Sequence, residues 1–232
     1  MYSINKKSQD TKRHEVKLVL NDQELSIFRL WQISHTSILQ SYDSRIVNSI
    51  YYDDDANSSV SDNISGISKR QKFRVRWYGS DIAEKPTLEI KTRVNKTGLK
   101  MNIDFPEENN AIQTLGLLEI GNIFELALRK QFPNFSLNLN PKIQVSYGRE
   151  YYEDSRGLRI TIDQNINFCD VSRADKPFSG VTIPYSQNVI EFKFMADSYP
   201  MVCDLLRITN FLPKRHSKYL IGLAKIGQVN YV

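Results

Sequence analysis

Cysteine and long apolar runs are both scarce in this sequence of 232 residues. Cys169 and Cys203 are too few for a disulfide framework, and neither has the spacing of a metal-binding pair. No apolar stretch approaches the roughly 18 residues that a membrane-spanning helix needs. Residues 1–12 are polar, unlike a secretory signal, and read as a flexible leader. We therefore expect a soluble, cytoplasmic protein with two free, buried thiols.

The common catalytic motifs are missing as well. The sequence contains no Walker loop, no Rossmann glycine pattern and no Ser/His/Asp arrangement. None of its three histidines has neighbours that indicate catalysis. Any chemistry must therefore rest on other charged side chains.

Strand-like segments that alternate basic and apolar residues are abundant. Residues 72–77 read Lys-Phe-Arg-Val-Arg-Trp, and successive side chains of a strand point to opposite faces. Lys72, Arg74 and Arg76 should therefore share one face. Related patterns recur in the expected strands 13–20, 86–95, 142–152, 157–164 and 188–195, with a further strand at 45–52. Because the polar face is basic in most of these strands, the sequence predicts a sheet closed around a polyanion.

The charge balance supports an internal anion site. Ten basic residues of these faces would turn inward with four acidic ones, a local charge of +6 in a chain whose total is +5. The rest of the chain would then be close to neutral, which argues against an external nucleic-acid surface. The inward set is Arg13, Lys17, Lys72, Arg74, Arg76, Lys91, Arg93, Arg149, Arg159 and Lys193, with Glu15, Glu89, Asp163 and Glu191.

Helices and loops are expected between the strands. Asn21 or Asp22 can cap a helix that runs to about residue 35, and the apolar spacing predicts further helices at 107–131, 196–210 and 217–226. Three segments are expected to be loops: 53–68, 96–100 and 170–187. No composition break divides the chain, so we expect one domain over 13–232 after the leader.

Eight short motifs, in a fixed order, resemble a known family. They are Arg-x-Glu-x-Lys (13–17), Ser-Ile-Tyr-Tyr-Asp (49–53), Arg-x-Lys-x-Arg-x-Arg-Trp-Tyr-Gly (70–79), Leu-Glu-Ile-Lys (88–91), Tyr-Gly-Arg (147–149), Leu-Arg-Ile-Thr-Ile-Asp (158–163), Ile-Glu-Phe-Lys-Phe (190–194) and Ser-Lys-Tyr (217–219). Together they look like the VTC domain, the catalytic module of the vacuolar transporter chaperone polyphosphate polymerase. That family belongs to the triphosphate tunnel metalloenzymes, and the resemblance covers about residues 13–225.

The resemblance implies an α+β fold: a closed, eight-stranded antiparallel β-barrel that forms a triphosphate tunnel flanked by helices. It also implies that the γ-phosphoryl group of ATP passes to a growing polyphosphate chain with the help of Mn²⁺ or Mg²⁺. The expected partners are ATP and polyphosphate or triphosphate, and not nucleic acid. Eukaryotic complexes add a membrane part, so a membrane partner stays open, as does the oligomeric state.

The resemblance also assigns roles to residues. It implies catalytic, phosphate-binding roles for Lys72, Arg74, Arg76, Arg149, Arg159 and Lys193, further ligand contacts from Lys17, Lys91, Lys100, Ser217 and Lys218, and metal binding by Glu191 and Glu15. The plainer alternatives are a solvated strand face for the basic residues, salt bridges for Glu15, Glu89 and Glu191, and an exposed loop lysine at Lys100.

Two other functions remain open from the sequence. The same cations could serve an inorganic triphosphatase or NTPase, or a binding module without catalysis. If the basic residues crowd a tunnel, neutralising Arg74 or Arg76 is expected to relieve repulsion and to raise the melting temperature of the empty protein.

Overall fold

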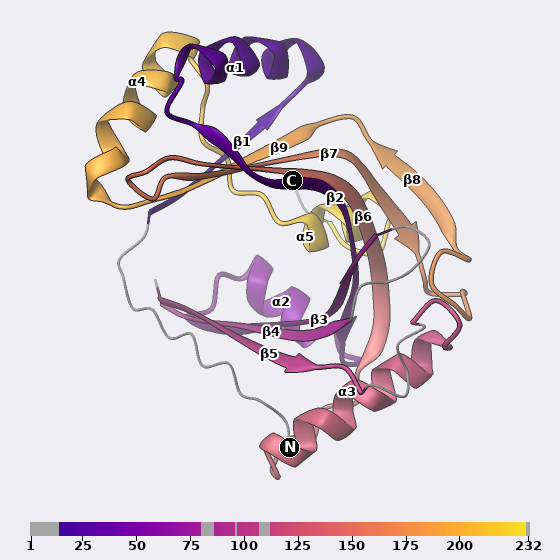
Figure 1. Ribbon diagram of the computed structural model, residues 1–232. Helices are drawn as coiled ribbons and strands as arrows, with labels where there is room; N and C mark the ends of the chain where they lie inside the picture. The colour runs from indigo at the N-terminus through magenta and orange to yellow at the C-terminus, as the bar shows by residue number, and fades with distance from the viewer. Residues whose placement is uncertain (1–13, 80–85, 96, 107–111, 231–232) are drawn as a thin grey trace.

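The computed structural model describes residues 14–79, 86–95, 97–106 and 112–230 (Figure 1). The predicted leader and Arg13 lie outside the described residues. The elements are β1 (His14–Leu20), α1 (Asp22–Ser34), β2 (Leu39–Asp53), α2 (Ser58–Ile64), β3 (Lys69–Tyr78), β4 (Thr87–Val94), β5 (Thr97–Asp104), α3 (Leu117–Gln131), β6 (Asn140–Glu153), β7 (Arg159–Asp170), β8 (Val181–Tyr185), β9 (Asn188–Phe194), the 3₁₀ turn η2 (Ala196–Ser198), α4 (Tyr199–Thr209) and α5 (Lys218–Lys225).

All the strands belong to one antiparallel sheet in the order β1-β9-β7-β6-β2-β3-β4-β5, with β8 paired to β7. The sheet curves so strongly that β1, β9 and β7 lie opposite β3, β4 and β5, with β2 and β6 between them (Figure 1). Among the described strands, β1 and β5 end the hydrogen-bonded path and do not pair with each other. The α+β class is as predicted. The described residues form nine strands instead of the predicted eight, and a closed barrel is not confirmed.

Strand β7 contains a β-bulge, which changes the face of the sheet to which its apolar side chains point. Ile160 and Ile162 pack on the convex face with α1 and α4, whereas Ile166 and Phe168 pack on the concave side with α5. All four residues have even numbers and would share one face of a regular strand. Because the two pairs point to opposite faces, one extra residue must lie between them. It lies near Asn165, which has a φ of 52°, where the register between β6 and β7 shifts. Bulges bend the strand and increase its twist, in keeping with the curvature seen here.

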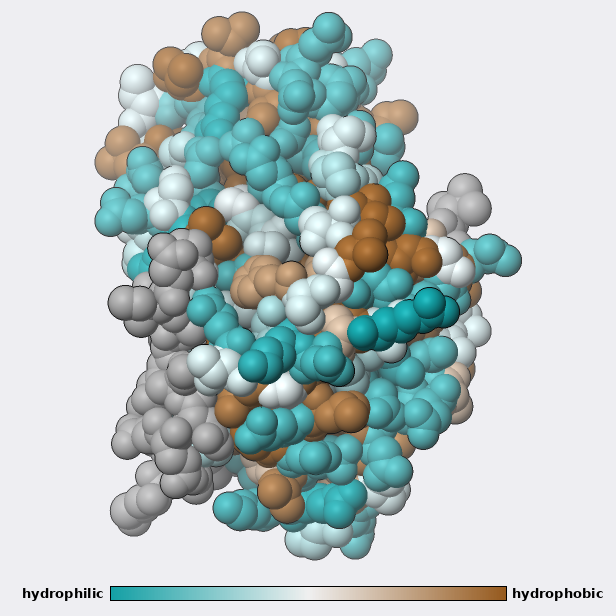
Figure 2. All heavy atoms as spheres, turned by 90° about the vertical axis from the view of Figure 1, so that its right-hand side faces the viewer, coloured by the Kyte–Doolittle hydropathy of each residue, from teal (hydrophilic) through white to brown (hydrophobic). Residues whose placement is uncertain are grey.

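The helices cover the sheet in three places. On the convex face, α3 packs Phe124 against Tyr52 and Phe73, and α1 packs Phe28 against Phe192. On the concave side lies α5, whose Gly222 has no room for a side chain: an added Cβ would come within 2.7 Å of Phe168. The convex surface in Figure 2 is mainly hydrophilic with separate apolar patches. Helix α2 packs on the same side as α5, where its Val60 joins the cluster of that helix, and the charged residues described below lie beyond these two helices.

The first helix begins as predicted. Asn21 accepts a hydrogen bond from the backbone N–H of Glu24, and the Glu24 carboxylate accepts one from the Asn21 N–H, which together form a capping box. The predicted helix at 107–131 begins later than expected, at Leu117. No helix in the described ranges is long and apolar enough to cross a bilayer.

The three predicted loops contain regular structure. Of the segment 96–100, the described residues 97–100 begin β5, in which Lys100 pairs with Lys91 of β4. The segment 53–68 contains α2, and 170–187 contains β8. Each of these elements is short, and its pairing partner is set by the tertiary fold, which local composition does not reveal. Both cysteines are free, Cys169 buried and Cys203 half-buried.

Candidate active site

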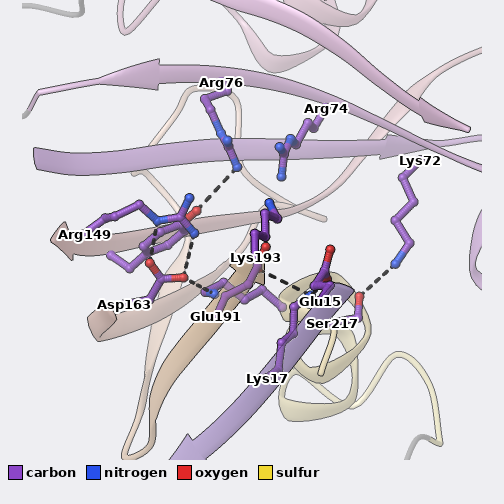
Figure 3. Close-up of polar contacts among 12 residues, drawn as sticks. Glu15, Lys17, Lys72, Arg74, Arg76, Arg149, Asp163, Glu191, Lys193 and Ser217 are labelled. Carbon is purple, nitrogen blue, oxygen red and sulfur yellow. Dashed lines mark hydrogen bonds and ion pairs between the residues drawn. The ribbon is translucent and has the colours of Figure 1, made fainter. Parts of the chain in front are cut away.

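The basic face of β3 lies on the concave side of the sheet, as the alternation predicts. Phe73, Val75 and Trp77 are buried in the convex core. Lys72, Arg74 and Arg76 therefore point the other way, towards side chains from β6, β7, β9 and β1 (Figure 3). The curvature of the sheet brings charged residues of widely separated strands together.

Glu89 of β4 anchors the first group of cations. Its carboxylate accepts a hydrogen bond from Arg74 Nε at 2.5 Å and from Lys100 Nζ at 2.7 Å, and Arg76 Nη1 lies 3.8 Å away. Only 3% of Glu89 is exposed. Burial alone would raise its pKa, but the three cations hold the pKa at about 2. Glu89 therefore stays ionised, in the salt-bridge role left open by the sequence.

Asp163 of β7 anchors a second group. Arg149 donates two parallel hydrogen bonds to its carboxylate, at 2.6 and 2.8 Å, and Lys218 Nζ donates a third at 2.5 Å. Burial favours the neutral acid, yet the charges of Lys218 and Arg149 lower the Asp163 pKa below its usual value. The ring of Tyr147 lies beneath both cations, 4.7 Å from Lys218 and 5.2 Å from Arg149. The guanidinium fork is thus fixed before any ligand binds.

Glu15 of β1 and Glu191 of β9 form a third group with two lysines. Lys17 Nζ lies 2.9 Å from Glu15 and 3.6 Å from Glu191, and Lys193 Nζ lies 2.6 Å from Glu191. Burial opposes ionisation of both carboxyl groups, and the charge of Glu191 also opposes ionisation of Glu15. The lysines outweigh these effects and lower the pKa of both acids. Two ionised carboxylates therefore lie within electrostatic reach of each other.

This carboxylate pair is the best candidate for a metal site. No cluster of three or more His, Cys, Asp or Glu side chains with metal-binding geometry occurs in the described ranges. Mg²⁺ and Mn²⁺, however, are often held by one or two carboxylates together with substrate phosphates. Glu15 and Glu191 fit an ion that arrives with phosphate, and Lys17 and Lys193 hold the pair in place without it.

Among the described residues, Lys72 is held by a hydroxyl group and not by a carboxylate. Its Nζ donates a hydrogen bond to Ser217 Oγ at 2.9 Å, and no ion pair joins it to a carboxylate in the part of the chain that the structure describes. Burial, together with the charges of Lys91 and Lys17, lowers the Lys72 pKa to about 7. The neighbouring charges that act on Lys72 are thus positive, and an anion bound here would offset them.

Substitution of Lys72 is expected to stabilise the empty protein. The unfolded chain binds a proton at Lys72 below its ordinary pKa of 10.5, whereas the folded protein does so only below about pH 7. Stability is therefore lost as pH falls from 10.5 to 7, and the full loss persists below pH 7. Lys72→Met should remove this loss and raise the melting temperature at pH 6.5 by more than about 2–4 °C, the shift that 1 kcal/mol produces in a chain of this size.

The matched variant Arg74→Met is expected to have the opposite effect. It leaves the buried Glu89 without its closest partner, and breaking a buried pair costs about 3 kcal/mol, or roughly 6–12 °C in melting temperature. The sequence led us to expect that neutralising Arg74 would raise the melting temperature. The ion pair with Glu89 leads us to expect a decrease instead. Thermal melts of the two variants at pH 6.5 and 9.5 check both statements, and equal shifts would contradict them.

The two ends of the sheet face each other across the concave side. The charge of Lys91, on β4, lowers the pKa of Glu15, on β1, although these strands do not pair. Burial lowers the pKa of Lys91, and Lys17 lowers it further, while Glu15 raises it. Lys91 therefore joins the same charged environment as Lys17 and Glu191.

Arg159 and Lys100 are placed differently from the predictions. Arg159 is the first residue of β7, and its side chain is 53% exposed. It pairs with Glu153 at 3.1 Å and not with Glu89, Asp163 or Glu191. It lies beside Lys193 in the register. Lys100 is neither in a mobile loop nor unpaired: it lies in β5 and binds Glu89. Its position is set by β5, which the sequence did not reveal.

Three polar residues that orient the arginines were not predicted from the sequence. Tyr51 accepts a hydrogen bond from Arg74 at 3.3 Å. Tyr147 accepts one from Arg76 at 3.4 Å, as does Ser49. All three lie in the motifs 49–53 and 147–149. Strand alternation could have placed them on the same face of the sheet as the arginines. They fix the arginine side chains on the concave side.

These features define a class: an antiparallel sheet, curved around a cationic site with fixed arginine forks and a carboxylate pair. A comparison with protein families identifies it more closely. The VTC domain matches residues 12–226, and the chain belongs to the VTC domain family.

Comparison with solved structures agrees on the fold. The PH1819 protein of Pyrococcus horikoshii OT3 is 18% identical, with a TM-score of 0.51, over 91% of this chain and 99% of that one. A putative adenylyl cyclase, HpAC1 from Hippeastrum, described as having a dominant triphosphatase activity, is 11% identical with a TM-score of 0.54, over 93% of this chain and 96% of that one. The fold is that of the triphosphate tunnel metalloenzymes. A search of curated proteins found no significant match.

Proposed function

We propose that this protein is a polyphosphate polymerase, which transfers the γ-phosphoryl group of ATP to a growing polyphosphate chain along the concave side of the sheet. The observation that carries the proposal is a surplus of cations. Nine basic side chains face four carboxylates in the groups described above. They are Lys17, Lys72, Arg74, Arg76, Lys91, Lys100, Arg149, Lys193 and Lys218 against Glu15, Glu89, Asp163 and Glu191.

A triphosphate supplies the missing negative charge. Partly buried cations repel one another at a cost that an anion between them removes. Arginine forks match phosphate oxygens with paired hydrogen bonds, and lysine acts as a point charge. Because Glu89 and Asp163 already fix Arg74 and Arg149, little reorganisation is needed when phosphate binds. We propose that the concave side thereby acts as a tunnel for the chain.

The reaction exchanges one phosphoanhydride bond for another. An oxygen of the terminal phosphate of the chain attacks the γ-phosphorus of ATP, and the bond to the β-phosphate oxygen breaks, with ADP as the leaving group. The attacking oxygen is already anionic, so no general base is needed. The protein must align the two groups and neutralise the transferred phosphoryl group, which Arg74, Arg76 and Lys193 are placed to do. A divalent ion bound at Glu191 and Glu15 would neutralise further charge on the phosphate oxygens.

Hydrolysis is the second candidate. The Hippeastrum neighbour with the same fold is described as a triphosphatase, and water needs the same cationic surroundings as a phosphate acceptor. The order of the eight motifs favours the polymerase, since it follows the VTC domain family to which the chain belongs. The two activities differ only in the acceptor.

The products of the reaction test the proposal. Purified protein with ATP and Mn²⁺ or Mg²⁺ is expected to yield ADP and long-chain polyphosphate, separated by gel electrophoresis. Release of only ADP and orthophosphate would assign the protein to the hydrolases. Tight tripolyphosphate binding without turnover in either metal would indicate a binding module.

A further inference from the structure

A group of tyrosines lies on the concave side next to the anchored arginines. Tyr42 of β2 and Tyr151 of β6 are register partners, with ring centroids 5.8 Å apart and planes at 81°. Tyr42 is 60% exposed and Tyr151 is half-buried. Because Tyr42 is so open to solvent, it has room for a further planar group beside it.

Two arginines lie close to this tyrosine pair. Arg45 is the register partner of Arg149, and its guanidinium lies 5.7 Å from the ring centre of Tyr78. Burial raises the pKa of Tyr151, while the charges of Arg149 and Arg45 lower it, as expected if both guanidinium groups lie near the phenol. The tyrosines are therefore continuous with the cationic site through Arg149.

The sheet register gives the distance from the tyrosines to the candidate metal site. Tyr151 pairs with Thr161 of β7, and Thr161 pairs with Glu191 of β9. Adjacent strands are about 4.8 Å apart, so the backbones of Tyr151 and Glu191 are separated by roughly 10 Å. A ligand that places phosphates near Glu191 and Lys193 can extend along this row to the tyrosines.

We propose that Tyr42 and Tyr151 form a stacking platform for the purine base of the donor nucleotide. This inference rests on the proposed function, because it assumes that phosphoryl groups bind beside Arg149 and Glu191. An aromatic ring recognises the π-face of a base and not its hydrogen-bonding edge. The platform therefore selects a nucleoside triphosphate over inorganic triphosphate, with little discrimination between ATP and GTP.

Loss of one ring is expected to weaken ATP binding by about five- to 150-fold, the factor that corresponds to the range measured for base–aromatic stacking. Binding of tripolyphosphate, which has no base, should not change. A loss of affinity for ATP without a loss of affinity for tripolyphosphate is therefore the result that identifies the platform.

Isothermal titration with ATP, GTP and tripolyphosphate, in EDTA to prevent turnover, tests the inference. Tyr151→Ala and Tyr42→Ala are expected to weaken ATP and GTP binding alike and to leave tripolyphosphate binding unchanged, whereas Tyr151→Phe, which keeps the ring, should resemble the wild type. Tyr42 is largely exposed, so its variant keeps the test valid if Tyr151→Ala does not fold. The control is Tyr199→Ala, a half-exposed tyrosine on α4.

Equal weakening of ATP and tripolyphosphate, or no change for ATP, would overturn the platform while leaving the proposed function standing. A wild-type protein that binds none of the three ligands would overturn the proposed function itself, and the platform with it.

Discussion

Tripolyphosphate is expected to raise the melting temperature of the protein by about 8–16 °C at a concentration one thousand times its Kd. A ligand that binds only the folded state adds about 4 kcal/mol under that condition. Each kcal/mol corresponds to about 2–4 °C for a chain of this size. The shift should be large because the cations of β3, β6 and β9 are already gathered in the empty protein (Figure 3). Thermal melts with and without tripolyphosphate measure it.

Arg76→Ala is expected to remove most of this shift at the same ligand concentration. Only 8% of Arg76 is exposed, and it is held by Ser49 and Tyr147 on the concave side. Each variant is compared with itself, with and without ligand, so a lower starting stability does not obscure the result. The matched control is Arg207→Ala on α4, whose side chain is 80% exposed, and it should keep the full shift.

An open nucleic-acid surface predicts the reverse pattern. Duplex DNA would then bind with a steep dependence on salt, because neutralised phosphates release counterions. Tripolyphosphate would hardly change the melting temperature. We expect weak DNA binding at physiological salt.

Glu191→Gln is expected to lower kcat by about two to three orders of magnitude, an effect comparable to the loss of one preorganised electrostatic contact in other enzymes. The amide keeps the shape of the side chain and removes the charge that a divalent ion requires. Tripolyphosphate binding in EDTA should persist or tighten slightly, because one negative charge near the phosphates is lost. Steady-state turnover in Mn²⁺, set beside titration in EDTA, separates the two effects.

Asp204→Asn serves as the control for Glu191→Gln, since it removes a carboxylate that is 59% exposed on α4 and pairs only with Arg207 in the described structure. Its turnover should match the wild type. Full activity of Glu191→Gln would show that the Glu15–Glu191 pair does not hold the metal. Loss of both binding and turnover would show instead a structural role for the Lys17–Glu191–Lys193 group.

The sequence predicted the basic face of β3 because strand alternation depends only on local geometry. A strand that buries Phe73, Val75 and Trp77 must present Lys72, Arg74 and Arg76 on its other face. The same reasoning placed Lys193 and Glu191 on β9 and Lys17 on β1. Helix α1 was predictable for a similar reason, since its Asn21 cap is a local signal.

The pairing of charges could not be read from the sequence. Which cation meets Glu89 or Asp163 depends on the register of several strands and on the curvature of the sheet. In the described ranges Arg74, Arg76 and Arg149 each meet a carboxylate, whereas Lys72 donates to the hydroxyl group of Ser217. Strand β5 was missed because its residues carry a turn-like composition and are ordered by pairing with β4.

A crystal structure of the protein with tripolyphosphate and Mn²⁺ would show where the phosphate groups bind. We expect them on the concave side, in contact with Arg74, Arg76, Arg149 and Lys193, with the metal at Glu191. Lys72 should leave Ser217 and turn towards the phosphates. Tripolyphosphate bound only on the convex surface, with no anion in contact with Arg74, Arg76, Arg149 or Lys193, would show that the concave side is not the phosphate site.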